Sequence, residues 1–241
     1  VHFMAETAKI MSPEKKIILP DFSAGCSLAE SITADDVRKL KKDNPGIPVV
    51  TYVNTSADVK AETDICCTSA NAVKIIESLK VDKVIFLPDE YLAKYVASKT
   101  HVKIISWKGK CEVHERFTDN EIIELRKKYP NLKVVSHPEC PPEVIKASDY
   151  TGSTGSMINY VKNTNAKDIF LVTECSMSDN IQIENPNINF VKPCNLCPHM
   201  KKITLQGILK SLINENNYVE IDKKIIQRAR GAIERMIAVG R

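Results

Sequence analysis

The fold of this chain is decided by residues 84–111, which read VIFLPDEYLAKYVASKTHVKIISWKGKC. This stretch offers an apolar strand-like run, a helical connection, a second strand-like run, a short turn and then Cys111. Two further stretches follow the same plan. Residues 1–26 read VHFMAETAKIMSPEKKIILPDFSAGC, and residues 169–197 read IFLVTECSMSDNIQIENPNINFVKPCNLC. The opening VHFMAE reads as a strand, and the connection in the third stretch is polar enough to be irregular. We interpret the three stretches as copies of one repeat.

The register of the repeat continues beyond its cysteine. A threonine follows seven positions later in each copy, at Thr33, Thr118 and Thr204. Glu121 completes a capping box with Thr118, and Asp36 gives a weaker version of the same pattern with Thr33. Apolar residues at helical spacing follow each threonine, so a helix is predicted after each one.

A second half-repeat occurs twice, from Val49 and from Lys133, at an offset of 85 residues. Strands that alternate with amphipathic helices predict an α/β fold with small parallel sheets. We expect three αβα domains related by a pseudo-threefold axis around a central site. They comprise residues 1–46 with a C-terminal helix at 218–241, residues 47–131, and residues 132–217. The half-repeat has no copy before Val1, so we expect an incomplete first domain and sequence missing upstream.

Composition limits the class of protein. The chain has 241 residues, a net charge of +4 and eight cysteines, with acids and bases interspersed. The sequence has no long basic stripe with interleaved aromatic residues, so nucleic acid is not the expected partner. No apolar run is long enough for a membrane helix. Without a secretory signal, eight cysteines favour metal binding or catalysis in a reducing cytoplasm over a disulfide framework.

The repeat places three cysteines, Cys26, Cys111 and Cys197, at equivalent positions after a strand and before a helix. Parallel sheets bind ligands at the carboxyl ends of their strands, so the three thiolates are predicted to converge. Soft thiolates select iron–sulfur clusters, zinc or copper(I). We favour one iron–sulfur cluster in an enzyme. Ordinary buried thiols remain an alternative, as does zinc at Cys194-x-x-Cys197 with His199.

Two further sets of residues obey the 85-residue offset. Tyr52 corresponds to His137 and Asn54 to Glu139, and these four are candidate acid–base and hydrogen-bonding groups at strand ends. Ser69 corresponds to Thr154, and both precede apolar helical patterns. Hydroxyls at a helix start suit a carboxylate or phosphate, although plain helix capping is the simpler alternative.

At these motifs the sequence resembles the quinolinate synthase family. The resemblance covers the whole chain, and its blocks occur in family order: VHFMAETAKI, LPDFSAGCSLAES, VVTYVNTSADVKAE, TSANAVKI, GKCEVHERFT, SHPEC, GSTGSM and CPHMKKITL. It implies three αβα domains around a [4Fe-4S] cluster with one open iron. It also implies the condensation of iminoaspartate with dihydroxyacetone phosphate to quinolinate, with L-aspartate oxidase or aspartate dehydrogenase as supplier of iminoaspartate.

The resemblance also assigns roles to residues. It implies Cys26, Cys111 and Cys197 as cluster ligands, and the same register selects Cys197 over Cys194. It implies that Tyr52, Asn54, His137 and Glu139 surround the substrate, and that the hydroxyls of Ser69 and Thr154 bind its carboxylate or phosphate groups. Our hypothesis is that Glu139 is the first candidate for general acid–base work, with Tyr52 and His137 assisting. The family's N-terminal segment, which carries a histidine, a tyrosine and a serine of the active site, has no counterpart here.

Two other functions stay open from the residues alone. The chain could be a non-catalytic iron–sulfur or redox sensor, in which a Cys194–Cys197 disulfide removes a ligand. It could also be a zinc hydrolase. Metal analysis is the test: iron and sulfide near four per chain would support the iron–sulfur enzyme, and one zinc per chain would support the hydrolase.

Overall fold

The structure, a computed structural model, describes residues 1–191 and 195–240. The chain forms two compact units, Val1–Gly109 with Pro198–Arg241 and Lys110–Cys197. Each unit contains one four-stranded sheet in which all strands are parallel. The α/β class with small parallel sheets is therefore confirmed. The predicted domain boundaries after residues 46, 131 and 217 stay predictions, as does the threefold arrangement.

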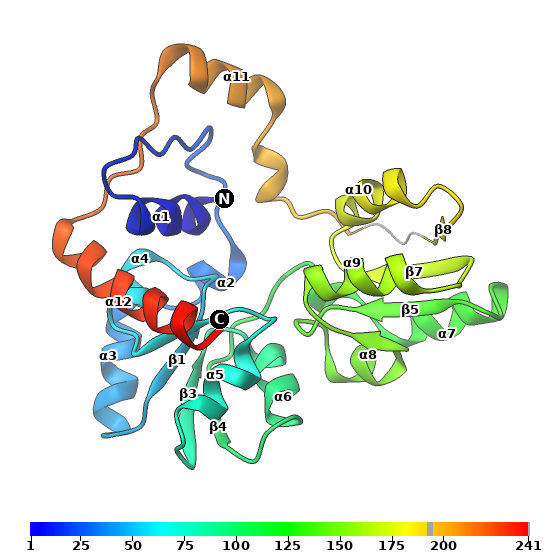
Figure 1. Cartoon of the computed structure of the whole chain (residues 1–241), viewed down its shortest axis with the longest axis horizontal. Helices are drawn as coiled ribbons and strands as arrows, with labels where there is room; N and C mark the ends of the chain where they lie inside the picture. The colour runs from blue at the N-terminus through cyan, green and yellow to red at the C-terminus, as the bar shows by residue number, and fades with distance from the viewer. Residues whose placement is uncertain (192–194, 241) are drawn as a thin grey trace. The chain divides into compact units, whose positions relative to one another are not determined.

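The first unit carries the sheet β2-β1-β3-β4 (Figure 1). Its strands are β1 (Val49–Tyr52), β2 (Ile65–Cys67), β3 (Lys83–Leu87) and β4 (Lys103–Ser106). Its helices are α1 (His2–Met11), α2 (Ser27–Glu30), α3 (Ala34–Asp43), α4 (Ala57–Ala61), α5 (Ala72–Ser78), α6 (Glu90–Ala97), the 3-10 helix η2 (Met200–Lys202), α11 (Leu205–Asn214) and α12 (Lys223–Gly240).

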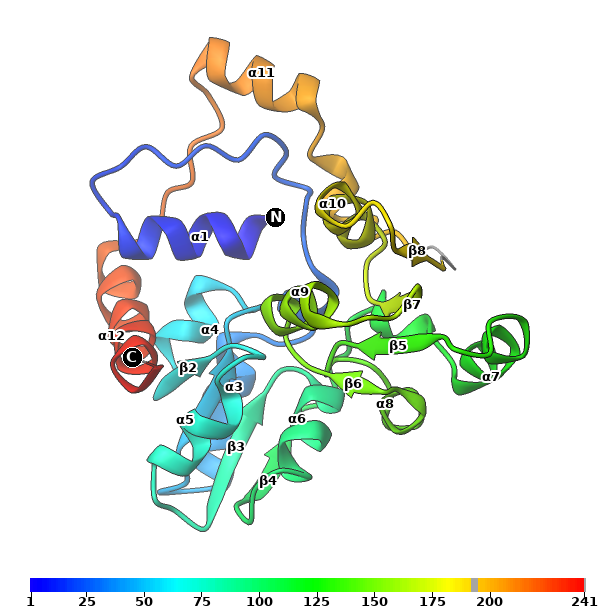
Figure 2. The same cartoon turned by 45° about the vertical axis from the view of Figure 1, so that its right-hand side comes forward.

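The second unit carries the sheet β6-β5-β7-β8, which has the same strand order (Figure 2). Its strands are β5 (Lys133–Ser136), β6 (Tyr150–Thr151), β7 (Asp168–Val172) and β8 (Asn189–Phe190). Its helices are the 3-10 helix η1 (His114–Arg116), α7 (Asp119–Lys128), α8 (Pro142–Ala147), α9 (Thr154–Asn163) and α10 (Ser176–Glu184). The identical order of the two sheets bears out the second and third copies of the repeat.

The three threonines of the repeat each start a helix of ten residues. Thr33 and Thr118 form full capping boxes at α3 and α7, and the Oγ1 of Thr204 accepts a hydrogen bond from Gly207 N at 3.0 Å at α11. The helix starts predicted from the register are thus confirmed. Each cap satisfies an amide that the first helical turn leaves unbonded.

One aspartate fixes the entry to each sheet, Asp64 in the first and Asp149 in the second. Asp64 accepts a hydrogen bond from Val49 N at 2.8 Å and forms an ion pair with Lys41. Asp149, 85 residues later, accepts hydrogen bonds from Val134 N at 2.9 Å and from Arg126 at 2.7 Å. Burial raises the pKa of Asp149, but these hydrogen bonds outweigh burial and hold that pKa below its usual value. Both copies of the half-repeat therefore share a charged clamp, in which Asp64 or Asp149 binds a strand amide and a basic side chain.

The helix that ends one copy of the repeat packs on the following sheet. Val37 of α3 is buried with Val49 and Ile85 of the first sheet, and Ile122 of α7 is buried with Val134 and other residues of the second. The equivalent helix α11 lies apart from the first sheet in both views (Figures 1 and 2). Its apolar residues are exposed; they are Leu205, Ile208, Leu209, Leu212 and Ile213.

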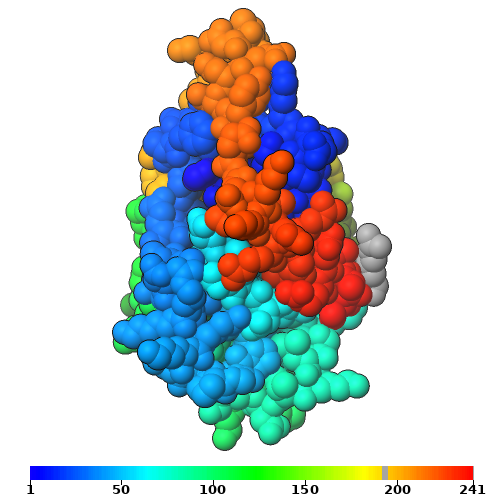
Figure 3. Space-filling view, turned by 90° about the vertical axis from the view of Figure 1, so that its left-hand side faces the viewer, coloured from blue at the N-terminus to red at the C-terminus, as the bar shows by residue number. Residues whose placement is uncertain are grey.

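The C-terminal helix α12 covers one edge of the first sheet. Its Ala229, Ala232 and Ile233 are buried with Ile10 of α1 and Cys66 of β2. Figure 3 shows α12 in red against the blue α1 segment and the cyan region of α4 and α5. None of the helices in the described part of the chain combines the length and apolar character that crossing a bilayer requires.

Three predictions of local structure are wrong. The second strand-like run expected before Cys26 forms no named strand, and Ile18 makes an isolated bridge with Tyr218 instead. The opening residues form the helix α1 rather than a strand, because Ile10 and Met11 lie together on the face that packs against α12. The polar connection of the third copy is also helical, as α10. There Ile181 is buried in the core and Met177 packs against the same cluster, and these contacts hold the helix in place between the adjacent strands. In all three copies, then, a helix precedes the segment that leads to the cysteine.

Candidate metal and active site

Three potential metal ligands meet inside the second unit. Cys111 precedes η1, His114 opens η1, and Glu139 lies in the loop between β5 and α8. One ligand atom from each of the three lies within 4.8 Å of the others, and His114 Nδ1 is 3.0 Å from Glu139 Oε2. His114 and Glu139 are buried and Cys111 is half-buried. This group lies where strands of a parallel sheet end, the position at which α/β proteins bind ligands.

Two neighbours hold the group in place. Thr173, directly after β7, lies with its Oγ1 3.0 Å from His114 Nε2. His137, directly after β5, stacks on the His114 ring with centroids 4.9 Å apart. The backbone amide of His137 also donates to Val172 O at 3.3 Å, which ties the loop to β7. Side chains from two adjacent strand ends thus surround one point.

The His137 imidazole is held neutral. Its pKa is lowered to about 4, chiefly by burial; the Glu139 carboxylate opposes this shift and neighbouring His114 adds to it. Glu139 N donates a hydrogen bond to His137 Nδ1 at 3.3 Å. In the neutral ring Nδ1 is then the acceptor, so the proton is assigned to Nε2. A neutral imidazole of this kind can donate a hydrogen bond to a substrate oxygen near pH 7.

The predicted cluster ligands are all reduced thiols and all half-buried. In the second unit, Cys111 and Cys197 pack against the same core cluster, which includes Val134, Phe170 and Val172. Both cysteines therefore border one core, and the approach of their thiols to each other stays a prediction. Cys26 lies in the first unit, so its convergence with the other two stays a prediction. Cys194 lies outside the described residues.

The loop before Cys26 is fixed by local bonds. Asp21 accepts hydrogen bonds from the amide and hydroxyl of Ser23, and Glu30 accepts one from Cys26 N at 3.2 Å. A Cβ on Gly25 would collide with the Glu30 carboxylate, so only glycine allows Glu30 this position. The sequence thereby places the Cys26 thiol at the start of α2.

The candidate residues of the first unit share one edge of its sheet. Tyr52 is the last residue of β1, is buried, and pairs with Cys67, the last residue of β2. Asn54 and Ser69 follow these strands by two residues and are half-buried. Since parallel strands end at a common edge, Asn54 and Ser69 lie on the ligand-binding side of this sheet.

Thr154 is the first residue of α9 and is exposed. Ser153, rather than Thr154, is the N-cap, and its side chain accepts a hydrogen bond from Ser156 N at 3.4 Å. The hydroxyl of Thr154 makes no hydrogen bond within the described ranges, which leaves it available to an anion at this helix start. Plain capping therefore explains Ser153 but not Thr154.

One further group lies close to Cys26 and is unexpected. Lys60 of α4 is fully buried, and its Nζ donates to Thr55 O and lies 5.8 Å from the Phe3 ring centroid. Burial lowers its pKa to about 8, although the Cys66, Glu6 and Cys26 charges oppose this. The 85-residue offset pairs Lys60 with the apolar Ile145 of α8. A buried lysine is costly at a position where the repeat otherwise carries isoleucine.

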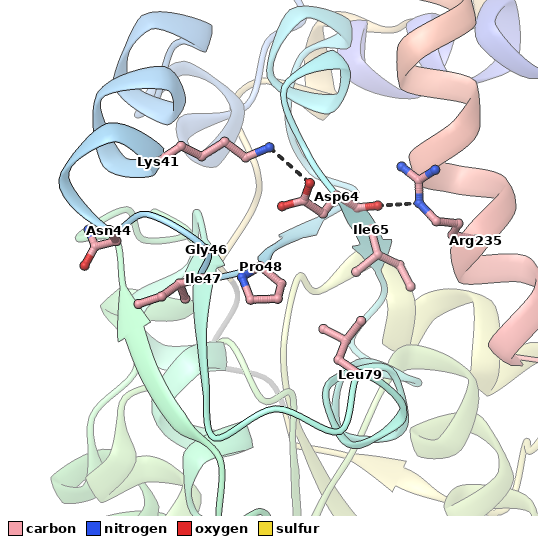
Figure 4. A pocket seen from close by; sticks show the side chains of 9 residues that line it. All are labelled: Lys41, Asn44, Gly46, Ile47, Pro48, Asp64, Ile65, Leu79 and Arg235. Atoms are coloured by element: carbon pink, nitrogen blue, oxygen red, sulfur yellow. Dashed lines mark hydrogen bonds and ion pairs between the residues drawn. The ribbon is translucent and has the colours of Figure 1, made fainter.

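A hollow of about 680 Å³ lies elsewhere in the first unit (Figure 4). Pro48, which precedes β1, and Asp64, which precedes β2, both line it, together with Lys41 and Arg235. Figure 4 shows Lys41 and Arg235 both directed to Asp64. This hollow is at the amino ends of the strands and is built around the structural clamp, so we do not assign the chemistry to it.

Sequence reasoning missed His114 and Thr173. His114 has no functional counterpart in the repeat, because Cys26 and Cys197 are followed three residues later by Ala29 and Met200. Thr173 has none either, since the residue 85 positions earlier is Pro88. The spacing Cys111-x-x-His114, typical of metal ligands, was the available signal. Thr173 could have been found only as the residue that directly follows the strand β7.

Comparison with known proteins gives consistent matches along the chain. Residues 1–238 match the sequence model of the family described as quinolinate synthetase A protein (NadA). Quinolinate synthase 1 of Mesorhizobium japonicum is 57% identical over 239 residues, which are 99% of this chain and 74% of the relative. Quinolinate synthase of Sinorhizobium fredii is 59% identical over 98% of this chain and 66% of its own length. Quinolinate synthase of Xylella fastidiosa is 56% identical over 99% and 70%, respectively.

Proposed function

Because the chain belongs to the quinolinate synthetase A protein family, we propose that it is a quinolinate synthase of NAD biosynthesis. The proposed reaction condenses iminoaspartate with dihydroxyacetone phosphate and yields quinolinate, phosphate and water. The observation that carries the proposal is the group formed by half-buried Cys111 with buried His114, His137 and Glu139. It sets a metal-binding thiol beside acid–base side chains at the ligand-binding edge of a parallel sheet.

The proposed cofactor is a [4Fe-4S] cluster held by Cys26, Cys111 and Cys197. Three features support the fit: all three are reduced thiols, all are half-buried, and Cys111 and Cys197 share one core. Thiolates are the usual ligands of such clusters. When bound through three protein ligands, the cluster supplies a Lewis acid for substrate oxygen or nitrogen atoms.

Glu139 is the proposed general acid–base residue. Its carboxylate is buried, with Oε2 3.0 Å from His114 Nδ1 and Oε1 3.8 Å from His137 Nδ1, so it lies beside both imidazoles. From there it can take up a substrate proton and return it during dehydration. His137 donates its Nε2 proton as a hydrogen bond to substrate oxygen, and the Tyr52 hydroxyl assists from the first unit.

Binding of the charged substrates is assigned to the strand and helix ends. Asn54 and Ser69 present polar side chains at the carboxyl edge of the first sheet, and Thr154 presents its hydroxyl at the start of α9. The positive end of a helix suits a carboxylate or phosphate without a lysine. We propose a cytoplasmic setting, with L-aspartate oxidase or aspartate dehydrogenase supplying iminoaspartate.

Replacing Glu139 with glutamine tests the acid–base role. Glutamine keeps the shape but cannot accept the proton, so kcat for quinolinate formation should fall roughly 10²- to 10⁴-fold while the visible absorption of the cluster is unchanged. The measurement is an anaerobic assay of quinolinate formation beside the absorption spectrum. Glu143→Gln, at an exposed position of α8, is the matched control and should retain the wild-type rate. A near-normal rate in Glu139→Gln with its cluster intact would remove Glu139 from the mechanism.

A further inference from the structure

The second unit contains three ligand types that together suit a single metal ion. Ligands around one ion lie no more than about 4.6 Å apart, twice the longest usual metal–ligand distance. The ligand atoms of Cys111, His114 and Glu139 lie within 4.8 Å of one another, so small side-chain rotations complete such a site. His114 lies in η1 and Glu139 in the loop between β5 and α8, and both side chains are buried.

The orientation of His114 is that of a metal ligand. Its Nε2 is held by Thr173 Oγ1 at 3.0 Å, as the second nitrogen of a metal-bound imidazole usually is. Its Nδ1 is buried and makes no hydrogen bond to any residue that the structure describes. Glu139 Oε2 is 3.0 Å from this Nδ1, but without the angles of a hydrogen bond. An ion bound between this nitrogen and the Glu139 carboxylate satisfies both buried groups.

The chemistry of the three ligands selects the ion. A thiolate, an imidazole and a carboxylate favour a divalent transition metal over calcium or magnesium. Three protein ligands also leave a fourth tetrahedral position for water. We propose that the chain binds one divalent transition-metal ion, such as Zn²⁺, Co²⁺ or Fe²⁺, through Cys111, His114 and Glu139, and that neither Cys26 nor Cys197 takes part.

The ligand set of this site differs from that of the proposed cluster, and the two sets have only Cys111 in common. A cluster needs thiolates from three different cysteines, whereas the single ion needs one thiolate and two side chains that are not cluster ligands. The ion and the cluster therefore compete for the Cys111 thiolate. Occupancy by zinc therefore holds the chain in a cluster-free state, and its removal opens Cys111 for cluster assembly.

Titration of the cluster-free full chain with Co²⁺ tests the ligand set. We expect one Co²⁺ per chain, tetrahedral visible absorption and a thiolate charge-transfer band in the near ultraviolet. Cys111→Ser should remove the charge-transfer band, and His114→Ala should weaken binding on the order of tenfold or more. Thr173→Val keeps the shape of the side chain but loses the hydrogen bond to His114, and it should weaken binding about 10- to 100-fold.

Cys26→Ser and Cys197→Ser are the matched controls, and each should bind Co²⁺ as the wild type does. Circular dichroism of every variant verifies that it folds. Loss of Co²⁺ binding in Cys197→Ser would place the ion among the cluster ligands and overturn the proposal. Unchanged binding in both Cys111→Ser and His114→Ala would overturn it as well. Failure of the cluster proposal would leave these results unaffected, because no iron or sulfide is used.

Competition during cluster assembly is the second test. One equivalent of Zn²⁺ added before iron and sulfide should lower the yield of cluster absorption in the wild type. In His114→Ala the zinc effect should disappear while the cluster still assembles, because His114 is not a proposed cluster ligand. A wild-type yield that is insensitive to zinc would contradict the sharing of Cys111.

Discussion

Replacing Cys111 with serine is expected to abolish both the visible absorption of the cluster and quinolinate formation. A serine oxygen is a hard, weak ligand for iron–sulfur clusters, and the loss of one of three thiolates leaves too few to hold the cluster. The same result is expected for Cys26→Ser and Cys197→Ser. The measurement is the anaerobic absorption spectrum after reconstitution, followed by the assay of quinolinate formation.

Cys140 provides the control for this experiment. It lies next to Glu139 in sequence and is fully buried, and its Sγ–H donates to Val172 O at 3.4 Å. Serine preserves that donor, so Cys140→Ser should keep the cluster. Loss of the cluster in Cys140→Ser together with its retention in Cys111→Ser would show that the repeat register selects the wrong cysteine.

Replacing Lys60 with methionine is expected to stabilise the chain at pH 7. The lysine is fully buried, and its pKa is lowered from 10.5 to about 8, which corresponds to about 3 kcal/mol less stability when the amine is charged. Methionine has a similar length and no charge, and the equivalent position of the repeat already carries Ile145. Chemical denaturation of both proteins at pH 7 measures the difference.

The pH dependence of this difference has a definite sign. Below pH 8 Lys60 is charged in both the folded and the unfolded chain, so the full burial cost is present. Between pH 8 and 10.5 the unfolded chain retains a proton that the folded chain has lost, so wild-type stability rises relative to the variant. The advantage of Lys60→Met should therefore vanish above pH 10.5.

Lys39→Met, at an exposed position of α3, is the control and should change the free energy of unfolding by no more than about 0.5 kcal/mol. A less stable Lys60→Met at pH 7 would mean that the contacts of Lys60 with Thr55 and Phe3 outweigh its burial.

The parts of the fold that the sequence predicted well are those set by local rules. Thr33, Thr118 and Thr204 start helices because capping depends on a few adjacent residues. The opening residues, by contrast, were predicted as a strand, whereas they form α1, which packs against α12 more than 200 residues later. The strand predicted there failed because a short apolar run fits either structure.

The candidate site divides in the same way. His137 and Glu139 were found because the 85-residue offset pairs them with Tyr52 and Asn54. His114 and Thr173 join the site through tertiary structure alone, and no offset points to either of them. The burial of Lys60 could not be predicted from the sequence either, because lysines are mostly exposed and only the structure shows this one to be buried.

The most direct test of the central claim is the iron and acid-labile sulfide content of the full chain after anaerobic reconstitution. A cluster held by Cys26, Cys111 and Cys197 predicts about four iron and about four sulfide per chain. That content should be lost in each of the three serine variants and retained in Cys140→Ser. One metal ion per chain without sulfide, unchanged by Cys26→Ser and Cys197→Ser, would contradict the cluster and leave only the single-ion site of Cys111, His114 and Glu139.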